Sequence, residues 1–565
     1  MSKIEISKKR IILLSLFLTI FVIGTVLIFV IPISVKATYN QTAQTTDGVT
    51  ISFNVFEPST SGMNKPAFIL GHGSMANKEM MKGYAIELAA AGFVAIPFDF
   101  RGHGQSTSGN TSAMFNDVIA IKEYLNTRAD IDMNSLGYIG YSMGGLGQSV
   151  VHVDPSFKCF IGVGTWLYPT LRTGNLTNPL NVLMIQALFD EAIELGELKE
   201  SLATRVGISV SAVDANKMYG SFEQENASMI YLDDDSNHLK VAWDQDFIRE
   251  ARNWAINAFD IDVLDENFYV NIRAIILLIQ VIGGIGFFFL VVEPFSKLIL
   301  LSKEERERDA ELEIYKIDIP EISIKKLSIK VLIYSLLLGI PGIIIFIPIL
   351  LILPFAIAGF VVTILFGQTF GLIILLWRIS KRLELSFKEI LKKPFQGRTK
   401  FLRQLALGTI LSIILFLISY SSVGLNYFGL VPAVIKIWGL AIFLVICFFI
   451  NVIYSLLMQV IIQNKFTDTL KDTLKMVFLG FIFPFLYYSI YLLILSGLTR
   501  SLFYFGNFIP LSLIMFTLNS SVSIIAYKKT GNIATGAIIY AVLLTFLIVT
   551  ASTPSTGLSF ISRFF

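Results

Sequence analysis

The stretch GYIGYSMGGLGQS, from Gly137 to Ser149, holds the residues whose types and spacing most directly suggest chemistry. Ser142 stands between Gly140 and Gly144 in the order G-x-S-x-G. A serine hydroxyl becomes a nucleophile only when a nearby base accepts its proton, and that base must itself be held in place. The pattern therefore raises a hydrolytic serine as a hypothesis, which requires a base and an acid elsewhere in the chain.

Histidine is the usual base in such a site, and the whole chain contains only four histidines. His72 and His103 lie in glycine-flanked loops, where we expect them to shape the loop rather than to carry protons. His152 follows Ser142 in a predicted helix, where a packed or surface histidine is expected. The fourth histidine, His238, stands in DDDSNHLK.

The elements around the serine fit a nucleophile held on a sharp turn. Leu136–Tyr141 is a short apolar run that predicts a strand, and Met143–Val151 predicts a helix. A strand-to-helix turn of this kind needs glycines beside it, because larger side chains would clash, and it lifts the hydroxyl above the edge of the sheet.

Short apolar runs that end in polar or glycine residues recur through this part of the chain. They are PAFILGHG, FVAIPFDF, LGYIGYS, FKCFIGVG and NVLMIQALFD, separated by helix-like stretches such as MMKGYAIELAAAG and AMFNDVIAIKEYLN. Alternating helices and continuous apolar strands are typical of an α/β domain with a doubly wound, mostly parallel sheet covered on both faces. We predict this domain over residues 37–266.

Three motifs in order resemble the α/β-hydrolase superfamily, in particular its serine aminopeptidase-like and monoacylglycerol lipase-like branch. They are Gly71-His72-Gly73-Ser74, then DFRGHGQS from Asp99 to Ser106, then GYSMGG from Gly140 to Gly145. The resemblance covers residues 45–260 and implies a serine hydrolase that needs no cofactor and no metal.

The resemblance also implies the roles of individual residues. In this superfamily the triad runs serine, acid, histidine along the chain, which assigns Ser142, Asp190 and His238 as catalytic residues. Asp190 follows the strand NVLMIQALFD, with Glu191 as the alternative acid, and Ala187 stands where the family commonly has a glycine.

The same resemblance assigns the oxyanion hole to two backbone N–H groups, those of Ser74 and Met143. The carboxylates Asp233–Asp235 near His238 are interpreted as a solvated acidic turn. A calcium loop is not supported there, because the spaced ligand pattern with a later glutamate is missing.

The cover over the site is expected to be small. Only LYPTLRTGNLTNP joins the fourth predicted strand to the fifth, which is too short for a substantial helical cap. A helical insertion over residues 191–228 is expected to roof the site in part. Such an open pocket suits a soluble ester, a thioester, or a short acyl or peptide substrate presented at the membrane.

The composition of the 565-residue chain is that of a multi-span membrane protein, with 54% hydrophobic and 15% charged residues and a mean hydropathy of +0.68. We predict an anchor within residues 1–36, spanning Ile11–Pro32, and a polytopic domain of unrecognised family over residues 267–565. Its eight predicted spans are Ala274–Val292, Val331–Leu351, Phe355–Trp377, Leu405–Val423, Val431–Val460, Met476–Leu495, Phe503–Ile525 and Ile533–Val549. Val331 to Trp377 must be two spans, because one helix of this length would be about 70 Å long.

Charge predicts the sidedness of the protein. Residues 37–266 hold 14 Lys and Arg against 28 Asp and Glu, whereas the remainder holds 31 against 14. Of these 31 basic residues, 26 fall in connections that share one side if the N-terminus is cytoplasmic. We therefore expect a multi-pass protein of the cell membrane with an extracytoplasmic hydrolase domain. Nucleic acid is not an expected partner, because the basic residues lie between apolar runs.

Two functions follow as hypotheses. The first is a membrane-anchored serine hydrolase that cleaves an ester, thioester or peptide bond through an acyl-enzyme, with a small acyl or peptide substrate and the bilayer as partners. The alternative is a transporter or sensor that uses the hydrolase fold only to bind a ligand. The oligomeric state stays open.

The spans hold few ionisable residues, and their inner amides are expected to bridge helices; these are Gln368, Asn451, Gln459 and Asn519.

Overall fold

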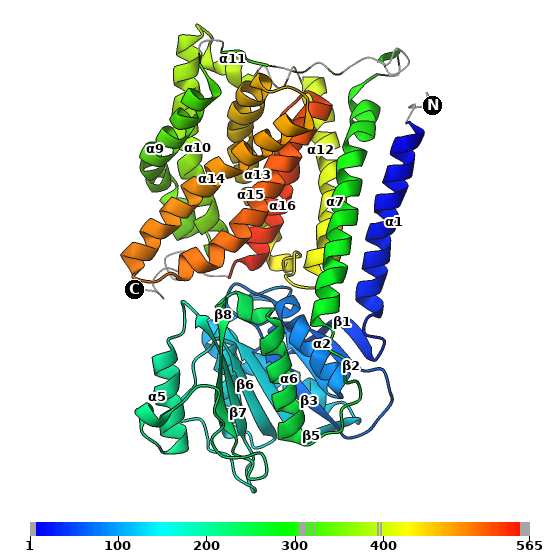
Figure 1. Cartoon of the computed structure of the whole chain (residues 1–565), viewed down its shortest axis with the longest axis vertical. Coiled ribbons are helices and arrows are strands. Elements are labelled where there is room, and N and C mark those ends of the chain that lie inside the picture. The colour runs from blue at the N-terminus through cyan, green and yellow to red at the C-terminus, as the bar shows by residue number, and fades with distance from the viewer. Residues whose placement is uncertain are drawn as a thin grey trace.

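A computed structural model describes residues 7–302, 304–305, 312, 314, 316–319, 322–392, 395 and 398–553. An α/β domain lies against one end of a bundle of long apolar helices (Figure 1). Helix α1 (Lys8–Val30) enters the α/β domain and helix α7 (Val270–Leu300) leaves it. This arrangement confirms the predicted fold class.

A mixed sheet forms the centre of the α/β domain, and within the described residues it has eight strands in the order β1-β2-β4-β3-β5-β6-β7-β8. Strand β2 is antiparallel to β1 and β4, while the strands from β4 and β3 to β8 pair in parallel. The strands are β1 (Val35–Gln44), β2 (Thr50–Pro58), β3 (Lys65–Gly71), β4 (Val94–Phe98), β5 (Ile131–Tyr141), β6 (Phe157–Val163), β7 (Asn181–Phe189) and β8 (Ser228–Asn237).

Helices cover both faces of the sheet, as expected for a doubly wound domain. Helices α2 (Lys82–Ala91) and α6 (Gln245–Phe259) pack in one hydrophobic cluster, and α3 (Phe115–Asn126) and α4 (Gln148–Val153) pack in the other. Helix α5 (Leu195–Val206) lies beside β8. The acidic stretch interpreted as a turn is instead part of a strand, because Asp233 pairs with Ala187 in the β7–β8 ladder.

Nine helical segments among the described residues are long and apolar enough to cross a membrane, which indicates a membrane protein. After α1 and α7 they comprise α9 (Ile324–Ile352), α10 (Ala356–Arg382), α12 (Arg398–Ser419), α13 (Ile437–Ser455), α14 (Leu470–Thr499), α15 (Phe503–Thr530) and α16 (Ala534–Ala551). The short helix α11 (Phe387–Lys392) precedes α12. The predicted break near Pro354 is confirmed, since α9 ends at Ile352 and α10 begins at Ala356. Parts of the connections between the predicted spans, from Val292 to Val331 and from Trp377 to Leu405, lie outside the described residues.

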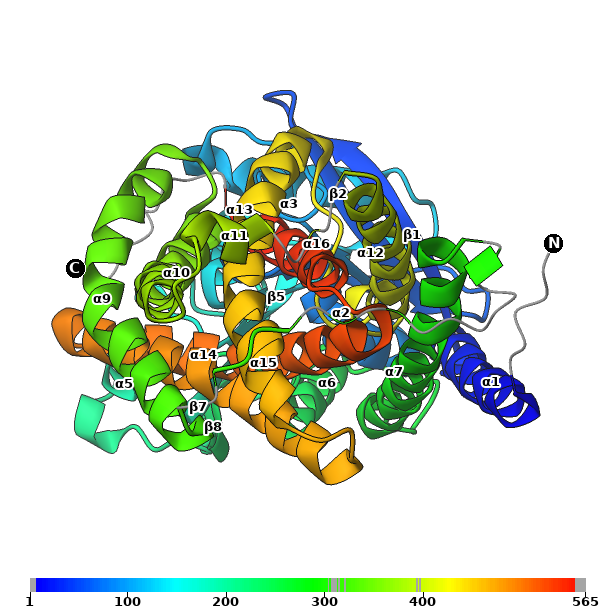
Figure 2. The same ribbon diagram turned by 90° about the horizontal axis from the view of Figure 1, so that it is seen from above.

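Polar and small residues join the membrane helices. The Asn519 amide on α15 donates to Asn451 Oδ1 on α13 at 3.1 Å, which confirms the bridging role predicted for this pair. Helices α1 and α7 lie side by side at the edge of the bundle (Figure 2). A Cβ at Gly283 of α7 would lie 2.5 Å from the Phe21 backbone nitrogen, so glycine allows this close approach.

Hydrogen bonds also fix the α/β domain against the membrane helices. Lys82 Nζ on α2 donates to the Leu425 carbonyl at 2.8 Å and to Asn426 Oδ1 at 3.1 Å, both in the loop after α12. Nearby, the Gly429 backbone N–H donates to Asn77 Oδ1 at 3.0 Å. Burial lowers the pKa of Lys82 to about 7, and the neighbouring Glu79 opposes this shift. The two domains therefore meet in a specific register.

The motif from Asp99 to Ser106 contains two residues that form buried ion pairs, Asp99 and Arg101. Asp99 accepts from Lys78 Nζ at 2.8 Å. The Arg101 side chain is 0% exposed and lies 2.7 Å from an Asp117 oxygen that is equally buried, and 2.6 Å from Asp47. These contacts anchor the loop after β4, so the charged residues of this motif serve the fold.

Replacing Arg101 by Met should therefore destabilise the protein strongly. The substitution leaves the Asp117 carboxylate buried without its cation, which typically costs about 3–5 kcal/mol. Thermal unfolding of the full-length protein in detergent measures the effect. Lys217→Met, which removes an exposed ion pair with Asp214, is the matched control and should leave the midpoint unchanged. Equal midpoints for both variants would contradict the structural role of Arg101.

Candidate active site

Ser142 lies on a strained turn directly after β5. Its φ is +50°, in the left-handed region that a serine adopts at a cost of about 1–3 kcal/mol. Neighbouring atoms come so close to the glycines around Ser142 that a side chain at these positions would clash. A Cβ at Gly144 would lie 2.3 Å from the Gly71 carbonyl oxygen, and one at Gly145 would lie 2.1 Å from Thr165 Oγ1. The G-x-S-x-G spacing thus packs the serine turn onto the loop after β3.

The structure brings together the three residues that the sequence assigned to the triad. Ser142 Oγ lies 2.9 Å from His238 Nε2, and His238 Nδ1 lies 3.0 Å from both carboxylate oxygens of Asp190. The His238 side chain is 4% exposed and that of Asp190 is 0% exposed. With Nδ1–H donated to the carboxylate, Nε2 is left to accept the serine proton.

Neighbouring groups hold the acid and the histidine in place. Asp190 Oδ1 accepts from the backbone N–H groups of Ala192 at 2.9 Å and Ile193 at 3.0 Å. The Tyr141 hydroxyl donates to the His238 carbonyl at 2.9 Å. The Ala187 carbonyl accepts from the Asp190 N–H at 3.2 Å, which closes the turn that leads to the acid.

Glu191, the alternative acid, has a different set of partners. Its Oε2 accepts from the His238 backbone N–H at 3.3 Å, and its Oε1 accepts from the Asn507 amide of α15 at 2.9 Å. Burial raises the pKa of its carboxyl. Glu191 thus connects the histidine loop to a membrane helix, a role that local sequence could not indicate because Asn507 lies 316 positions away.

The loop from Gly71 to Ser74 lies against the nucleophile. A Cβ at Gly73 would lie 3.2 Å from Ser142 Cβ. Ser74 lines the same pocket as Ser142, and Met143 follows the serine at the start of the next helix. The backbone groups assigned to the oxyanion hole therefore belong to the two segments that meet at the nucleophile.

The other three histidines have the surroundings expected of them. His72 Nε2 accepts from the Phe100 N–H at 3.1 Å, and its Nδ1 donates to the Gly73 carbonyl at 2.7 Å. Burial lowers the pKa of His72 to about 4 and that of His103 to about 3, and the contacts of His103 with the Arg101 and Ser74 carbonyls, at 3.1 and 3.0 Å, hold its loop against the loop after β3. His152 is exposed on α4.

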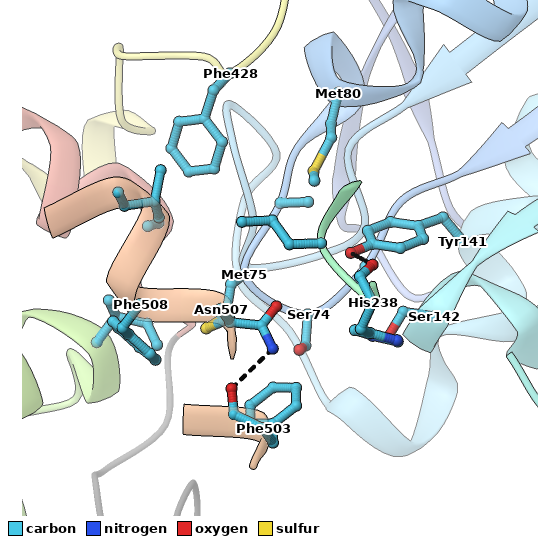
Figure 3. Close-up of a pocket in the computed structure, with 16 residues that line it drawn as sticks. Ser74, Met75, Met80, Tyr141, Ser142, His238, Phe428, Phe503, Asn507 and Phe508 are labelled. Atoms are coloured by element: carbon cyan, nitrogen blue, oxygen red, sulfur yellow. Dashed lines mark hydrogen bonds between the residues drawn. The ribbon is translucent and has the colours of Figure 1, made fainter. Parts of the chain in front are cut away.

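A pocket of about 560 Å³, counted with its open mouth, adjoins Ser142 and His238. Figure 3 shows Phe503, Asn507 and Phe508 of α15 across the pocket from these two residues. The expectation that residues 191–228 roof the site in part is wrong, since the pocket-lining residues of the described chain come from the hydrolase loops and the membrane domain. The insertion packs elsewhere because Leu198 and Leu202 of α5 are buried in the hydrophobic cluster beside β8.

One further group of carboxylates lies outside this pocket. Oxygens of Asp233, Asp244 and Asp246 lie within 4.8 Å of one another, close enough to share a divalent cation. Lys240 Nζ already lies 3.2 Å from Asp244, so a positive charge is present beside this group.

Gly506→Ala should slow the reaction of Ser142 with a fluorophosphonate. The added Cβ would lie 2.1 Å from Glu191 Oε1, so Glu191 must move and release the His238 backbone. A displacement of 1 Å at a reacting group can lower the rate by about 100-fold. A smaller shift of His238 should therefore lower the rate of labelling by about tenfold. Gly497→Ala on α14 has open space around its Cβ and should react like the wild type. Equal rates for the two variants would show that α15 does not position the histidine.

Comparisons with known proteins find similarities in sequence and in structure. Residues 62–221 match the profile of the family described as "Serine aminopeptidase, S33". Two proteins of Mycobacterium tuberculosis, both described as uncharacterized, are 29% identical over 102 residues, which is 18% of this chain and 36% of theirs. The chain thus spans about a third of the length of these relatives.

Similar solved structures include an esterase of Pyrococcus furiosus, with 14% identity and a TM-score of 0.31 over 39% of this chain and 92% of that one. A cold-adapted esterase from an Arctic intertidal metagenomic library shows 17% identity and a TM-score of 0.30 over 40% of this chain and 94% of that one. By its strand order the domain that carries Ser142 has an α/β-hydrolase fold, and its residues 62–221 are similar to the family described as "Serine aminopeptidase, S33".

Proposed function

We propose that this protein is a membrane-bound serine hydrolase that cleaves an ester, thioester or peptide bond through an acyl-enzyme. The observation that supports this most directly is the 2.9 Å contact between Ser142 Oγ and His238 Nε2, with Asp190 behind the imidazole at 3.0 Å. Such a chain of contacts lets the imidazole take the serine proton and keeps the resulting positive charge next to a carboxylate.

In the first half of the reaction, Ser142 Oγ attacks the carbonyl carbon of the substrate while His238 Nε2 takes the hydroxyl proton. The negative charge that develops on the carbonyl oxygen needs fixed donors, and the backbone N–H groups of Ser74 and Met143 are the candidates. Losing one such donor typically costs about 2.7–4 kcal/mol of transition-state stabilisation. His238 then gives the proton to the leaving group, and the acyl group stays on Ser142.

In the second half, water attacks the acyl-enzyme. His238 takes a proton from the water and returns it to Ser142 Oγ as the acid product leaves. Asp190 keeps its charge throughout and holds the ring, because its carboxylate also accepts two backbone N–H groups.

The hydrolase domain lies on the extracytoplasmic side in this proposal. The support is the distribution of lysine and arginine, which favours a cytoplasmic N-terminus. Near that end of α1, Arg10 pairs with Glu293 of α7 at 2.6 Å, and Lys529 of α15 pairs with the same carboxylate at 2.8 Å.

Fluorophosphonate labelling of the purified protein tests the chemistry. Ser142→Ala should abolish labelling, and Asp190→Asn should lower its rate by about 10⁴-fold, because the ring loses its correct tautomer. Asp235→Asn is the matched control on an exposed carboxylate and should label like the wild type. Labelling of Ser142→Ala at the wild-type rate would reject the serine mechanism and leave the ligand-binding alternative.

Cysteine accessibility tests the sidedness. Both native cysteines, Cys159 and Cys447, are buried, so the labelling of an introduced cysteine can be measured with little labelling of the native ones. With a membrane-impermeant maleimide, Ser61→Cys on the hydrolase domain should react in intact cells. Lys388→Cys, exposed in α11 at the other end of the bundle, should react only after the membrane is opened. The opposite pattern would contradict an extracytoplasmic hydrolase domain.

A further inference from the structure

The pocket beside Ser142 has two halves that come from different domains. One half consists of the hydrolase loops, with Ser142, His238 and the segment 73–76. The other half consists of membrane-helix residues and the loop that carries Phe428. The reacting groups thus face apolar side chains contributed by the membrane domain (Figure 3).

One face of α15 supplies most of the membrane half. The residues that line the pocket have the spacing i, i+4, i+5 and i+8, which places them on one side of the helix; they are Phe503, Asn507, Phe508 and Leu511. Phe503 lies at the reacting end, with its ring 6.1 Å from the imidazole of His238. Leu511 lies about 12 Å further along the helix, given 1.5 Å per residue. The pocket therefore extends from the nucleophile along a membrane helix.

The remaining walls are also apolar. Ile357 comes from the start of α10 and Ala551 from the end of α16, and Met75 and Met80 come from the hydrolase side. Methionine adapts its shape to flexible apolar ligands. Asn507 is the polar side chain on this face of α15, and its amide already donates to Glu191 and to the Phe503 carbonyl.

These walls discriminate between the substrates that the chemistry allows. The backbone of a peptide would place N–H and C=O groups against side chains that offer no partner, which is unfavourable. An acyl chain gains from every methylene removed from water. A short soluble ester would leave the far part of the pocket empty.

We propose that the substrate is a long-chain fatty acyl ester of a membrane lipid, with its ester carbonyl at Ser142 and its acyl chain along α15. This inference rests on the proposed function and adds the substrate class and the binding site of the chain. The membrane domain is then the acyl-binding half of the enzyme. A bilayer lipid is the source, because three of the elements that line the chain site, α10, α15 and α16, are membrane helices.

The reaction on such a lipid is a simple hydrolysis. Ser142 Oγ forms a bond to the acyl carbon, the bond from that carbon to the lipid alcohol breaks, and the alcohol leaves with the proton from His238. Water then replaces Ser142 on the acyl carbon, so one ester and one water give one fatty acid and one alcohol.

A chain-length series with matched tryptophan variants tests the site. The wild type should show kcat/KM rising from butyryl to palmitoyl esters. Leu511→Trp fills the far part of the pocket and should lower the palmitoyl value by about tenfold or more relative to the butyryl value, a typical effect of altered apolar contacts. Leu513→Trp, on the exposed side of the same helix, should leave the ratio unchanged. An unchanged ratio in Leu511→Trp, or faster cleavage of short peptides than of lipid esters, would overturn the proposal.

A binding measurement separates this inference from the catalytic proposal. The Ser142→Ala protein is reconstituted in vesicles that contain a phospholipid with a diazirine near the end of one acyl chain. Illumination should crosslink residues of the pocket face, 503–511, and Leu511→Trp should reduce this crosslinking. Crosslinks confined to residues on the opposite side of α15, such as Leu513, which is 42% exposed, would overturn the acyl site. Crosslinks on the pocket face without any fluorophosphonate labelling of the wild type would instead reject the hydrolase proposal alone.

Discussion

The close packing of two backbone segments, the turn at Ser142 and the loop after β3, is the constraint on which the site depends. The turn at Gly144 lies so near the Gly71 carbonyl that a methyl group would not fit between them. This contact holds Ser142 at a φ of +50° and keeps the segment of Ser74 beside the nucleophile. The strain of the turn is tolerated because the surrounding sheet is fully packed on both faces.

The parallel sheet then explains why residues far apart in the chain meet. Ser142, Asp190 and His238 each follow the carboxyl end of a strand, β5, β7 and β8 respectively. Such ends gather at one edge of a parallel sheet, and in this protein the edge faces the membrane helices. The helices thereby take the position of a cap. A substrate that reaches the serine must share the pocket with α15, which joins the choice of substrate to the membrane domain.

Hydrogen bonds of two polar side chains hold the two domains in register. Lys82 reaches carbonyl and amide oxygens of the loop after α12, and Glu191 reaches Asn507 of α15. Both contacts cross the boundary between the domains. Because Glu191 also accepts a hydrogen bond from the His238 backbone N–H, a shift of α15 would displace His238.

The resemblance to the α/β hydrolases assigned the order of the triad, whereas the sequence pattern by itself determined the α/β class, the nine candidate spans and the turn at Ser142. These features are local, since hydrophobic periodicity and glycine spacing act over a few residues. The polar edge strand β1 was not predicted, because its residues alternate between partial burial and exposure without an apolar run. The acidic end of β8 also lacks an apolar run, so its sequence predicts a turn rather than a strand.

Only the tertiary structure decided what covers the site and what Glu191 does. The insertion over residues 191–228 looked like a roof because it is adjacent in sequence, yet the pocket is covered largely by α15, whose Asn507 lies 316 positions from Glu191. Nothing in the local pattern of α15 distinguishes a face toward a pocket from a face toward lipid, because both are apolar. Contacts between distant apolar surfaces depend on how whole domains pack, and a single sequence carries no local signal for that packing.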